Sequence, residues 1–184
     1  MPTLTYFKTF LKDYRVGAFT KSSKFAVAKV CDAADFSRDA VIVEYGAGDG
    51  VVTNAILERM TPHSRLIAIE SNPFFLEKLS LINDSRLIVV HDIAQHLPDI
   101  LATYGIADVH FVFSSIPFSL IKKHVRREIV TNTFQALAPG GSFIVYQYST
   151  AMSKMLKNVF GNVRISFIPL NFPSYFLMEA KKRS

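Results

Sequence analysis

The sequence predicts an α/β protein with a doubly wound sheet of seven strands, mostly parallel, which ends in an antiparallel C-terminal hairpin and follows a helical N-terminal extension. Three observations predict this fold. From about residue 40 the chain alternates β-branched runs with helical stretches, as parallel strands joined by crossover helices do. A glycine-rich turn follows the first of these runs. The 184 residues, 49% hydrophobic and 20% charged, suit one folded domain and exclude a disordered chain.

The first 36 residues are predicted to be helical and basic. In the first helix, apolar side chains recur at helical spacing: Tyr6, Phe7, Phe10, Leu11 and Tyr14. A second helix, opened by Ser22 or Ser23, is expected to turn these side chains toward the sheet: Phe25, Val27, Ala28, Val30 and Cys31. Residues 1–30 hold six Lys and Arg against one Asp, a net charge of +5 in a chain whose total is +6. This basic end suggests an anionic partner, either nucleic acid or an anionic membrane face.

The remainder of the chain is predicted as strands and helices in alternation. The parallel strands are expected at 40–45, 65–70, 86–91, 108–114 and 142–148. The helices between them are expected at 51–60, 72–81, 98–104 and 120–137, the last of them stopped by Pro139, Gly140 and Gly141. After a helix at 152–159, strands at 163–168 and 175–180 are joined by a short turn. Such a closing pair is expected to form an antiparallel hairpin on the edge of the sheet.

The most specific motif is VIVEYGAGDGVVT, which begins at Val41. Glu44 lies in the strand, and three glycines follow it: Gly46, Gly48 and Gly50. Glycines allow a tight turn and let the main chain approach a ligand closely. Dinucleotide sites usually have GxGxxG, whereas a carboxylate before the loop repels a pyrophosphate and accepts a hydrogen bond from a cationic amino group. Glu70, 20 residues after the last glycine, indicates a ribose-containing cofactor without identifying it.

At these residues the chain resembles the class I S-adenosylmethionine-dependent methyltransferases, which have a Rossmann-like fold, and the resemblance implies S-adenosyl-L-methionine as cofactor. In that family the glycine loop surrounds the methionine part, an acid after the second strand takes both ribose hydroxyls, and an acid after the third strand meets the adenine amino group. Glu70 and Asp92 stand at the two acidic positions. The resemblance implies cofactor contacts from Glu44, Gly46, Ala47, Gly48, Gly50, Glu70, Ser71, Asp92, Ile93 and Ser114.

Within this superfamily the chain looks like the bacterial phospholipid N-methyltransferases, which are themselves similar to the rRNA adenine dimethyltransferases. The resemblance rests on FLKDYRVGAFTKSS, EYGAGDGVVT, SSIPFSLI, APGGSFIVYQYS and NVRISFIPLNFP. It implies stepwise methylation of phosphatidylethanolamine toward phosphatidylcholine, with a phospholipid headgroup and an anionic membrane surface as partners. Ser114–Phe118 stands where the rRNA enzymes have an Asn-Leu-Pro-Tyr type segment, which argues against adenine in RNA as acceptor. An adenine N6-methyltransferase and an inactive binding protein of the same fold remain alternatives.

The reaction implied is a direct displacement, in which a neutral amine attacks the activated methyl group and the nitrogen gains the charge. Aromatic faces suit the resulting cation. The headgroup candidates are Tyr14, Phe19, Phe118, Tyr146 and Tyr148, and Lys21 or Arg15 is a candidate for the lipid phosphate. Together with Ser114 from the segment after the fourth strand, Tyr14, Phe118 and Tyr148 are the catalytic candidates. The base is not identifiable, and His91 or water is possible.

The organisation predicted is a lid or membrane-contact segment at 1–36 and a methyltransferase domain at 37–184. The aromatic and basic first helix has the pattern of an interfacial helix, and the alternative is a lid packed on the sheet. Since neither a spanning segment nor a signal peptide is evident, we expect a cytoplasmic protein, peripheral at the inner face of the membrane. The single Cys31 is expected to be a buried hydrophobe, and no metal is expected. The remaining histidines are expected at the surface or in packing: His63, His96, His110 and His124.

Overall fold

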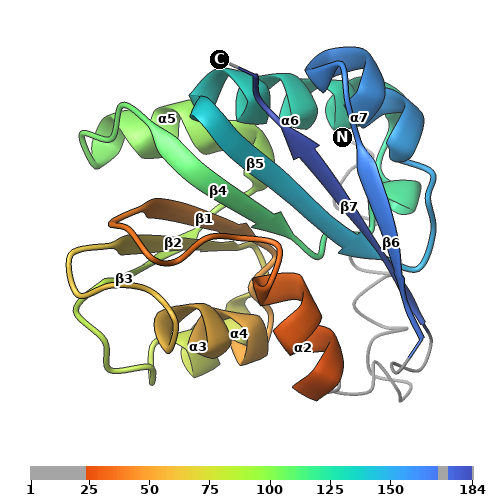
Figure 1. The fold of residues 1–184 in the computed structure, drawn as a ribbon. Helices are drawn as coiled ribbons and strands as arrows, with labels where there is room; N and C mark the ends of the chain where they lie inside the picture. Colours follow the sequence, from red (N-terminus) through yellow and green to blue (C-terminus); the bar gives the residue numbers. More distant parts are fainter. Residues whose placement is uncertain (1–23, 170–173, 184) are drawn as a thin grey trace.

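The computed structural model describes residues 24–169 and 174–183, so the predicted first helix and the candidates Tyr14, Arg15, Phe19 and Lys21 lie outside the described residues. Seven strands form one sheet in the order β3-β2-β1-β4-β5-β7-β6 (Figure 1). They are β1 (Val41–Tyr45), β2 (Arg65–Glu70), β3 (Leu87–His91), β4 (Val109–Ser114), β5 (Leu137–Gln147), β6 (Arg164–Ile168) and β7 (Tyr175–Lys181). The first five are parallel, and β7 runs antiparallel to both β5 and β6. The predicted fold class is confirmed.

Helices cover both faces of the sheet. One face carries α2 (Lys24–Cys31), α3 (Val51–Leu57) and α4 (Pro73–Leu79), and the other carries α5 (Leu97–Thr103), α6 (Lys123–Ala136) and α7 (Ser153–Phe160) (Figure 1). Two short 3₁₀ turns, η1 (Ala94–His96) and η2 (Phe118–Leu120), precede α5 and α6. In β1, Ile42 packs toward α2 and α3 while Val43 and Tyr45 belong to the core under α5–α7, as alternation along a strand requires.

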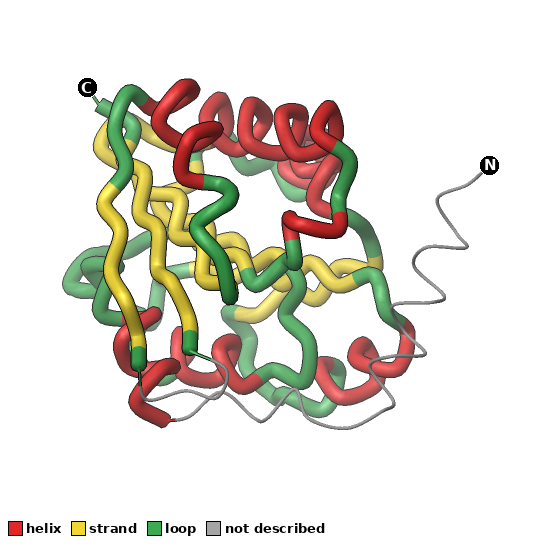
Figure 2. Tube along the Cα trace, turned by 90° about the vertical axis from the view of Figure 1, so that its right-hand side faces the viewer, coloured by secondary structure: helices red, strands yellow, loops and turns green. Residues whose placement is uncertain are grey.

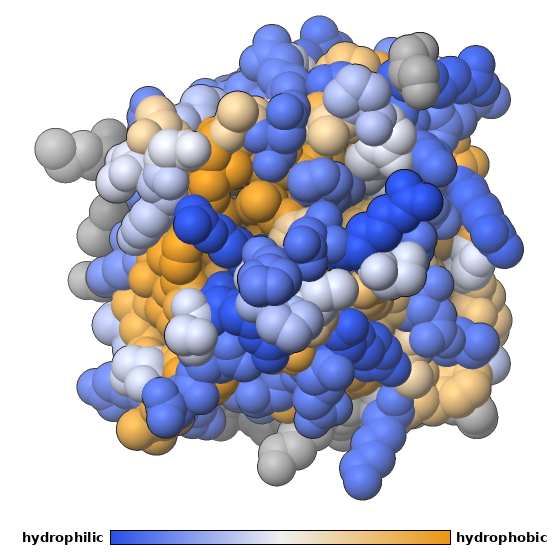
Figure 3. All heavy atoms as spheres, turned by 60° about the vertical axis from the view of Figure 1, so that its left-hand side comes forward, coloured by the Kyte–Doolittle hydropathy of each residue, from blue (hydrophilic) through white to orange (hydrophobic). Residues whose placement is uncertain are grey.

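The strand order reverses between β1 and β4, where the chain switches from building one half of the sheet to building the other. In open α/β sheets, ligands bind at such a switch point, outside the carboxyl ends of the strands. Figure 2 looks onto this end of the sheet. On the side that lies at the left of Figure 1, where the parallel strands begin, hydrophilic side chains separate the apolar areas (Figure 3).

Two sequence predictions are wrong in detail. The strand expected from 142 begins at Leu137, because the Pro-Gly-Gly run forms a bulge in β5 instead of a loop, and the register with β4 skips between Val109 and Phe111. Gly140 and Gly141 pair there with Lys182 through backbone hydrogen bonds of 2.9 and 2.8 Å.

The second error concerns α2, where Phe25 does not face the sheet. Phe25 is 40% exposed and lies beneath Lys29, whose Nζ is 5.9 Å from the ring centroid. The buried stripe of α2 is Ala26, Val27, Val30 and Cys31, which leaves Phe25 one position off the buried face. Burial of Cys31 is confirmed, and burial raises the pKa of its thiol to about 11.

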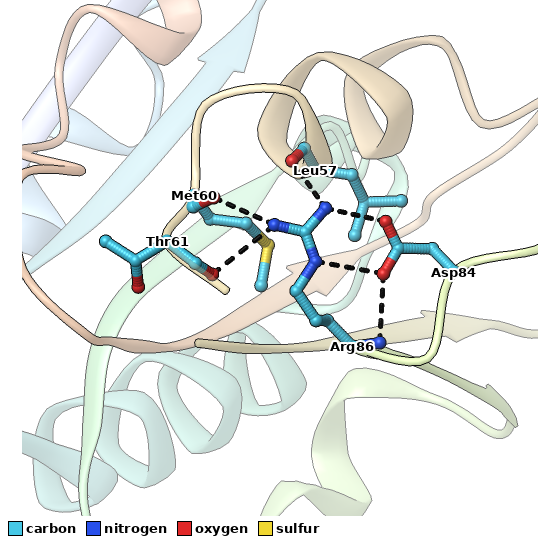
Figure 4. Close-up of polar contacts among 5 residues, drawn as sticks. All are labelled: Leu57, Met60, Thr61, Asp84 and Arg86. Carbon is cyan, nitrogen blue, oxygen red and sulfur yellow. Dashed lines mark hydrogen bonds and ion pairs between the residues drawn. The ribbon is translucent and has the colours of Figure 1, made fainter. Parts of the chain in front are cut away.

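Arg86 holds the end of α3 against the start of β3 (Figure 4). Its guanidinium donates to the carbonyl oxygens of Leu57, Met60 and Thr61 at 2.8, 2.8 and 3.3 Å. The same group pairs with Asp84 at 2.6 Å and holds the pKa of that carboxyl at about 2. Because α3 directly follows the glycine loop, this arginine fixes the element on which the loop rests.

Candidate active site

The loop between β1 and α3 is held by three glycines with positive φ: Gly46, Gly48 and Gly50, at 72°, 57° and 81°. A Cβ at Gly50 would lie 3.0 Å from a methyl group of Ile82 and 3.2 Å from one of Leu79 in α4, so a side chain there would crowd the contact between the loop and α4. Among the described residues, a Cβ at Gly48 would meet only the Gly46 carbonyl oxygen within 4 Å. In this part of the chain the backbone at Gly48 therefore leaves room for a ligand to approach, whereas the side chain of Ala47 is buried against Ala68 and Leu79.

Glu44 lies beneath this loop and is fully buried. Thr53, from α3, donates its hydroxyl to Glu44 Oε2 at 2.6 Å. Among the described residues, Glu44 Oε1 has no hydrogen-bond partner. Loss of solvation raises the pKa of this carboxyl to about 8, and the negative charges of Glu70 and Asp49 add to the effect. A buried carboxyl with an unused oxygen suits a cationic donor from a ligand.

Glu70, at the end of β2, joins two loops through one carboxylate. Oε2 accepts from the Gly48 backbone N–H at 2.9 Å, and Oε1 accepts from that of Asn72 at 2.8 Å. A carboxylate has about four lone-pair positions, so both oxygens retain capacity for ligand hydroxyls. Ser71 lies between Glu70 and Asn72. Asn72 caps α4 by accepting from the Phe74 N–H at 3.1 Å, which fixes the second loop.

Asp92 follows β3 and is held by its neighbours. Its Oδ1 accepts from the Ile93 N–H at 2.8 Å and lies 2.7 Å from His96 Nδ1. The Asp92 backbone N–H in turn donates to the Glu70 carbonyl oxygen at 3.2 Å, which places the two acids on neighbouring strand ends. The contact of His96 with Asp92 was not predicted, although the four-residue spacing between the two could have suggested it.

The segment after β4 meets the glycine loop through Ser115. The Ser115 hydroxyl donates to the Gly46 carbonyl oxygen at 2.7 Å. The Ser115 backbone N–H donates to the Tyr45 carbonyl oxygen at 3.3 Å. Ser114, the sequence candidate, is fully buried, and its hydroxyl accepts from the Ile116 N–H at 3.3 Å. The side chain facing the loop is therefore that of Ser115.

Phe118 is not brought to this edge. Its ring is fully buried in the core under α5–α7 and packs edge-on against Phe143, with centroids 6.5 Å apart. A ring enclosed by the core cannot offer its face to a ligand, so the expectation that Phe118 lines the headgroup site is corrected.

Three tyrosines gather where β5 ends and β7 begins: Tyr146, Tyr148 and Tyr175. The Tyr146 and Tyr175 ring centroids are 6.1 Å apart at 73°, and those of Tyr148 and Tyr175 are 5.0 Å apart at 32°. The Tyr148 and Tyr175 hydroxyls lie 3.5 Å apart. Tyr146 and Tyr148 are two of the headgroup candidates predicted from the sequence. Tyr175 was missed, because nothing in the sequence says that β7 inserts beside β5.

Two histidines can now be placed. His91 is exposed at the end of the edge strand β3, three strand spacings or about 14 Å from β4. His110 accepts the Val41 N–H on Nδ1 at 3.0 Å, which fits its predicted packing role. Within 24–169 and 174–183, no group of three His, Cys, Asp or Glu side chains is arranged to hold a metal ion. The helices in those ranges include none long and apolar enough to span a membrane.

Comparison with known proteins shows a relative that aligns with most of the chain. No protein-family model matches the chain. An ornithine lipid N-methyltransferase from Singulisphaera acidiphila is 31% identical over 148 residues, which are 77% of each chain. A ribosomal RNA small subunit methyltransferase H from Burkholderia vietnamiensis is 33% identical over 81 residues, which are 44% of this chain and 26% of that protein.

Solved structures share the fold. A 1,6-didemethyltoxoflavin-N1-methyltransferase from Burkholderia thailandensis, solved with S-adenosylhomocysteine, superposes with a TM-score of 0.71 at 17% identity and covers 96% of this chain and 87% of its own. A precorrin-6y C5,15-methyltransferase from Geobacter metallireducens superposes with a TM-score of 0.68 at 16% identity, and the match covers 90% of this chain and 94% of that one. At these identities the likeness concerns the fold alone.

The residues at the switch point fit the cofactor of such enzymes. The unused oxygen of Glu44, the remaining acceptor capacity of Glu70 and the open space at Gly48 match an ammonium group, ribose hydroxyls and a closely approaching ligand. Because an extended relative, the fold and these residues agree, the chain belongs to the class I S-adenosylmethionine-dependent methyltransferases, in the same family as the Singulisphaera enzyme, with S-adenosylmethionine as its cofactor.

Proposed function

We propose that this methyltransferase acts on the amino group of a membrane lipid headgroup and converts phosphatidylethanolamine stepwise toward phosphatidylcholine. The observation that carries the proposal is the similarity to a lipid N-methyltransferase over 77% of both chains. The similarity to the rRNA methyltransferase from Burkholderia vietnamiensis spans only 26% of that protein and gives weaker support to a nucleic acid acceptor. The name of the Singulisphaera relative makes ornithine lipid, another amine-bearing lipid, the second candidate acceptor.

We assign the cofactor contacts as follows. Glu44 would accept from the amino group of the methionine part, Glu70 from the ribose hydroxyls, and Asp92 from the adenine amino group. Gly46 and Gly48 would let the backbone approach, with Ala47 and Gly50 shaping the loop and with Ser71 and Ile93 adjoining the two acids. When bound, S-adenosylmethionine supplies a methyl group activated by the sulfonium charge.

The chain's own residues would position the amine for an in-line attack. Positioning alone can lower the activation free energy by several kcal/mol, because it removes the entropy cost of bringing two reactants together. Ser115 joins the segment after β4 to the glycine loop and so fixes the distance between acceptor and cofactor sites. The amine must lose a proton before it attacks. Since His91 is about 14 Å from β4, we assign that proton to water.

We further propose that residues 1–36 form a membrane-contact segment and residues 37–184 the methyltransferase domain. Within residues 1–36 the structure describes α2, which packs on the sheet and would attach the membrane-contact segment at the edge of the active site. Each basic residue near an anionic surface contributes about 1 kcal/mol, so a net charge of +5 in residues 1–30 suffices for reversible association. In this arrangement Tyr14 would lie near the headgroup, and Arg15 or Lys21 near its phosphate.

The test is transfer of labelled methyl from S-adenosylmethionine. The purified protein is offered vesicles of phosphatidylethanolamine, vesicles of ornithine lipid and, separately, unmodified ribosomal RNA. Mono-, di- and trimethylated phosphatidylethanolamine is the expected product. Label only in ornithine lipid would keep the lipid class and correct the headgroup. Label only in RNA would overturn the proposal while leaving the cofactor site in place.

A further inference from the structure

A row of side chains runs along the carboxyl edge of the sheet on the face covered by α2 and α3. The strands β1, β4, β5 and β7 are consecutive neighbours. They contribute, in that order, Glu44, Ser115, Tyr146 and Tyr175, with Ser115 just beyond the end of its strand. The cofactor contacts account for the first part of this row. The tyrosines at its far end remain to be explained.

The three tyrosines are arranged as one ring supported by two others. Tyr148 is 37% exposed, whereas Tyr146 and Tyr175 are 5% and 8% exposed. The Tyr175 ring is tilted by 32° against that of Tyr148 at a centroid distance of 5.0 Å, and Tyr146 meets Tyr175 edge-on. This packing fixes the orientation of the Tyr148 ring, which is the most exposed of the three rings.

Burial and Glu44 set the electrostatic surroundings of these rings. Burial and the nearby negative charge of Glu44 raise the pKa of Tyr146 well above its usual value, and a hydrogen bond with Ser115 only partly offsets them. Burial raises the pKa of Glu44 to about 8, so its charge attracts a positive group over the rings only above that pH. An aromatic face adds the attraction of its own quadrupole.

We propose that Tyr148 binds the ammonium group of the acceptor on its ring face, that Tyr175 is the residue that positions this ring, and that the pair favours the methylated forms of the amine. The inference deepens the proposed function and rests on it for an amine as acceptor. A primary ammonium has three N–H donors that prefer water or an anion, whereas a quaternary ammonium has only polarised methyl groups that suit an aromatic face. A partly methylated headgroup would therefore be retained for the next transfer.

The experiment measures binding of two headgroups without turnover. Phosphocholine and phosphoethanolamine are titrated by NMR into the full-length protein saturated with S-adenosylhomocysteine. The wild-type protein should bind phosphocholine more tightly than phosphoethanolamine. Tyr148→Leu and Tyr175→Leu should each weaken phosphocholine binding about fivefold and abolish the preference for it. Tyr148→Phe and Tyr175→Phe keep the aromatic rings, so they should keep both the affinity for phosphocholine and the preference over phosphoethanolamine.

A matched control is Tyr104→Leu, which removes a 39% exposed tyrosine at the end of α5. Its headgroup binding should equal that of the wild type. A wild-type protein that does not prefer phosphocholine, or a Tyr175→Leu protein that binds it normally, overturns the inference. Circular dichroism of Tyr175→Leu, compared with that of the wild type, distinguishes loss of ring positioning from misfolding. Since no methyl transfer is measured, preference for phosphocholine in a protein that labels no lipid would sink the proposed function and leave this site standing.

Discussion

Replacement of Glu44 by glutamine should stabilise the cofactor-free protein at alkaline pH and leave it unchanged at acid pH. The pKa of Glu44 is raised from 4.5 in the unfolded chain to about 8 in the folded protein, mainly by loss of solvation. Between these values the folded protein keeps a proton that the unfolded chain has lost. The free energy of unfolding contributed by this group therefore falls as the pH rises through this window. An amide at the same position does not titrate.

The magnitude follows from the width of the window. One pKa unit corresponds to about 1.4 kcal/mol. Between pH 5 and pH 8 the free energy of unfolding of the wild type should therefore fall by about 3 kcal/mol, whereas that of Glu44→Gln should not. For a chain of this length, that difference is about 6–12 °C in melting temperature. The amide keeps an acceptor for the Thr53 hydroxyl, which limits other effects of the substitution.

The assay is urea denaturation of the cofactor-free protein at pH 5, 6.5 and 8. The two proteins should have similar midpoints at pH 5 and diverge as the pH rises. Glu58→Gln, at an exposed position that ends α3, is the matched control and should follow the wild type at every pH. Parallel pH profiles for wild type and Glu44→Gln would refute the reasoning. The same variant should bind S-adenosylmethionine more weakly by calorimetry, because it has lost the carboxylate that would meet the amino group.

Three further outcomes are expected. Glu70→Ala should abolish cofactor binding by calorimetry while circular dichroism reports a folded protein, and Glu70→Gln, which retains one acceptor oxygen, should bind weakly; normal binding by Glu70→Ala would remove the assignment. Arg86→Met should lower the free energy of unfolding by about 2–4 kcal/mol in urea denaturation, because three carbonyl oxygens lose their donor, whereas the exposed Arg65→Met should change little. Deletion of residues 1–15 should reduce flotation with anionic vesicles much more than it reduces cofactor affinity, and unchanged flotation would contradict a membrane role for that segment.

The order of strands and helices along the chain was predicted correctly, because the local sequence signals in these elements agree with one another. β2 has the predicted bounds, Arg65–Glu70, and α4 begins at Pro73, one residue after the predicted start. The positions of Glu70 and Asp92 at strand ends followed from the same alternation. These features depend on residues close together in the chain, where spacing carries the information.

Features that depend on contacts between distant segments were not predicted. The Pro-Gly-Gly run signals a loop by itself, and only its pairing with Lys182 makes it part of β5. Whether Ser114 or Ser115 faces the glycine loop depends on the side to which the chain turns after β4. The buried position of Phe118 and the approach of Tyr175 to Tyr148 likewise depend on how distant strands and helices meet. Ring and hydroxyl groups can be listed from a sequence, but their mutual orientation follows from tertiary packing.

The position of β7 between β5 and β6 has a consequence for synthesis on the ribosome. β6 is made first, yet among the described strands it pairs only with β7, so it has no backbone partner until residues 175–181 have emerged. Until then β5 also remains an open sheet edge, a template for unwanted strand addition. A chain grows by about 5–20 residues each second, so this exposed state is brief. The strand that completes the sheet also delivers Tyr175, so the acceptor site proposed above would be assembled last.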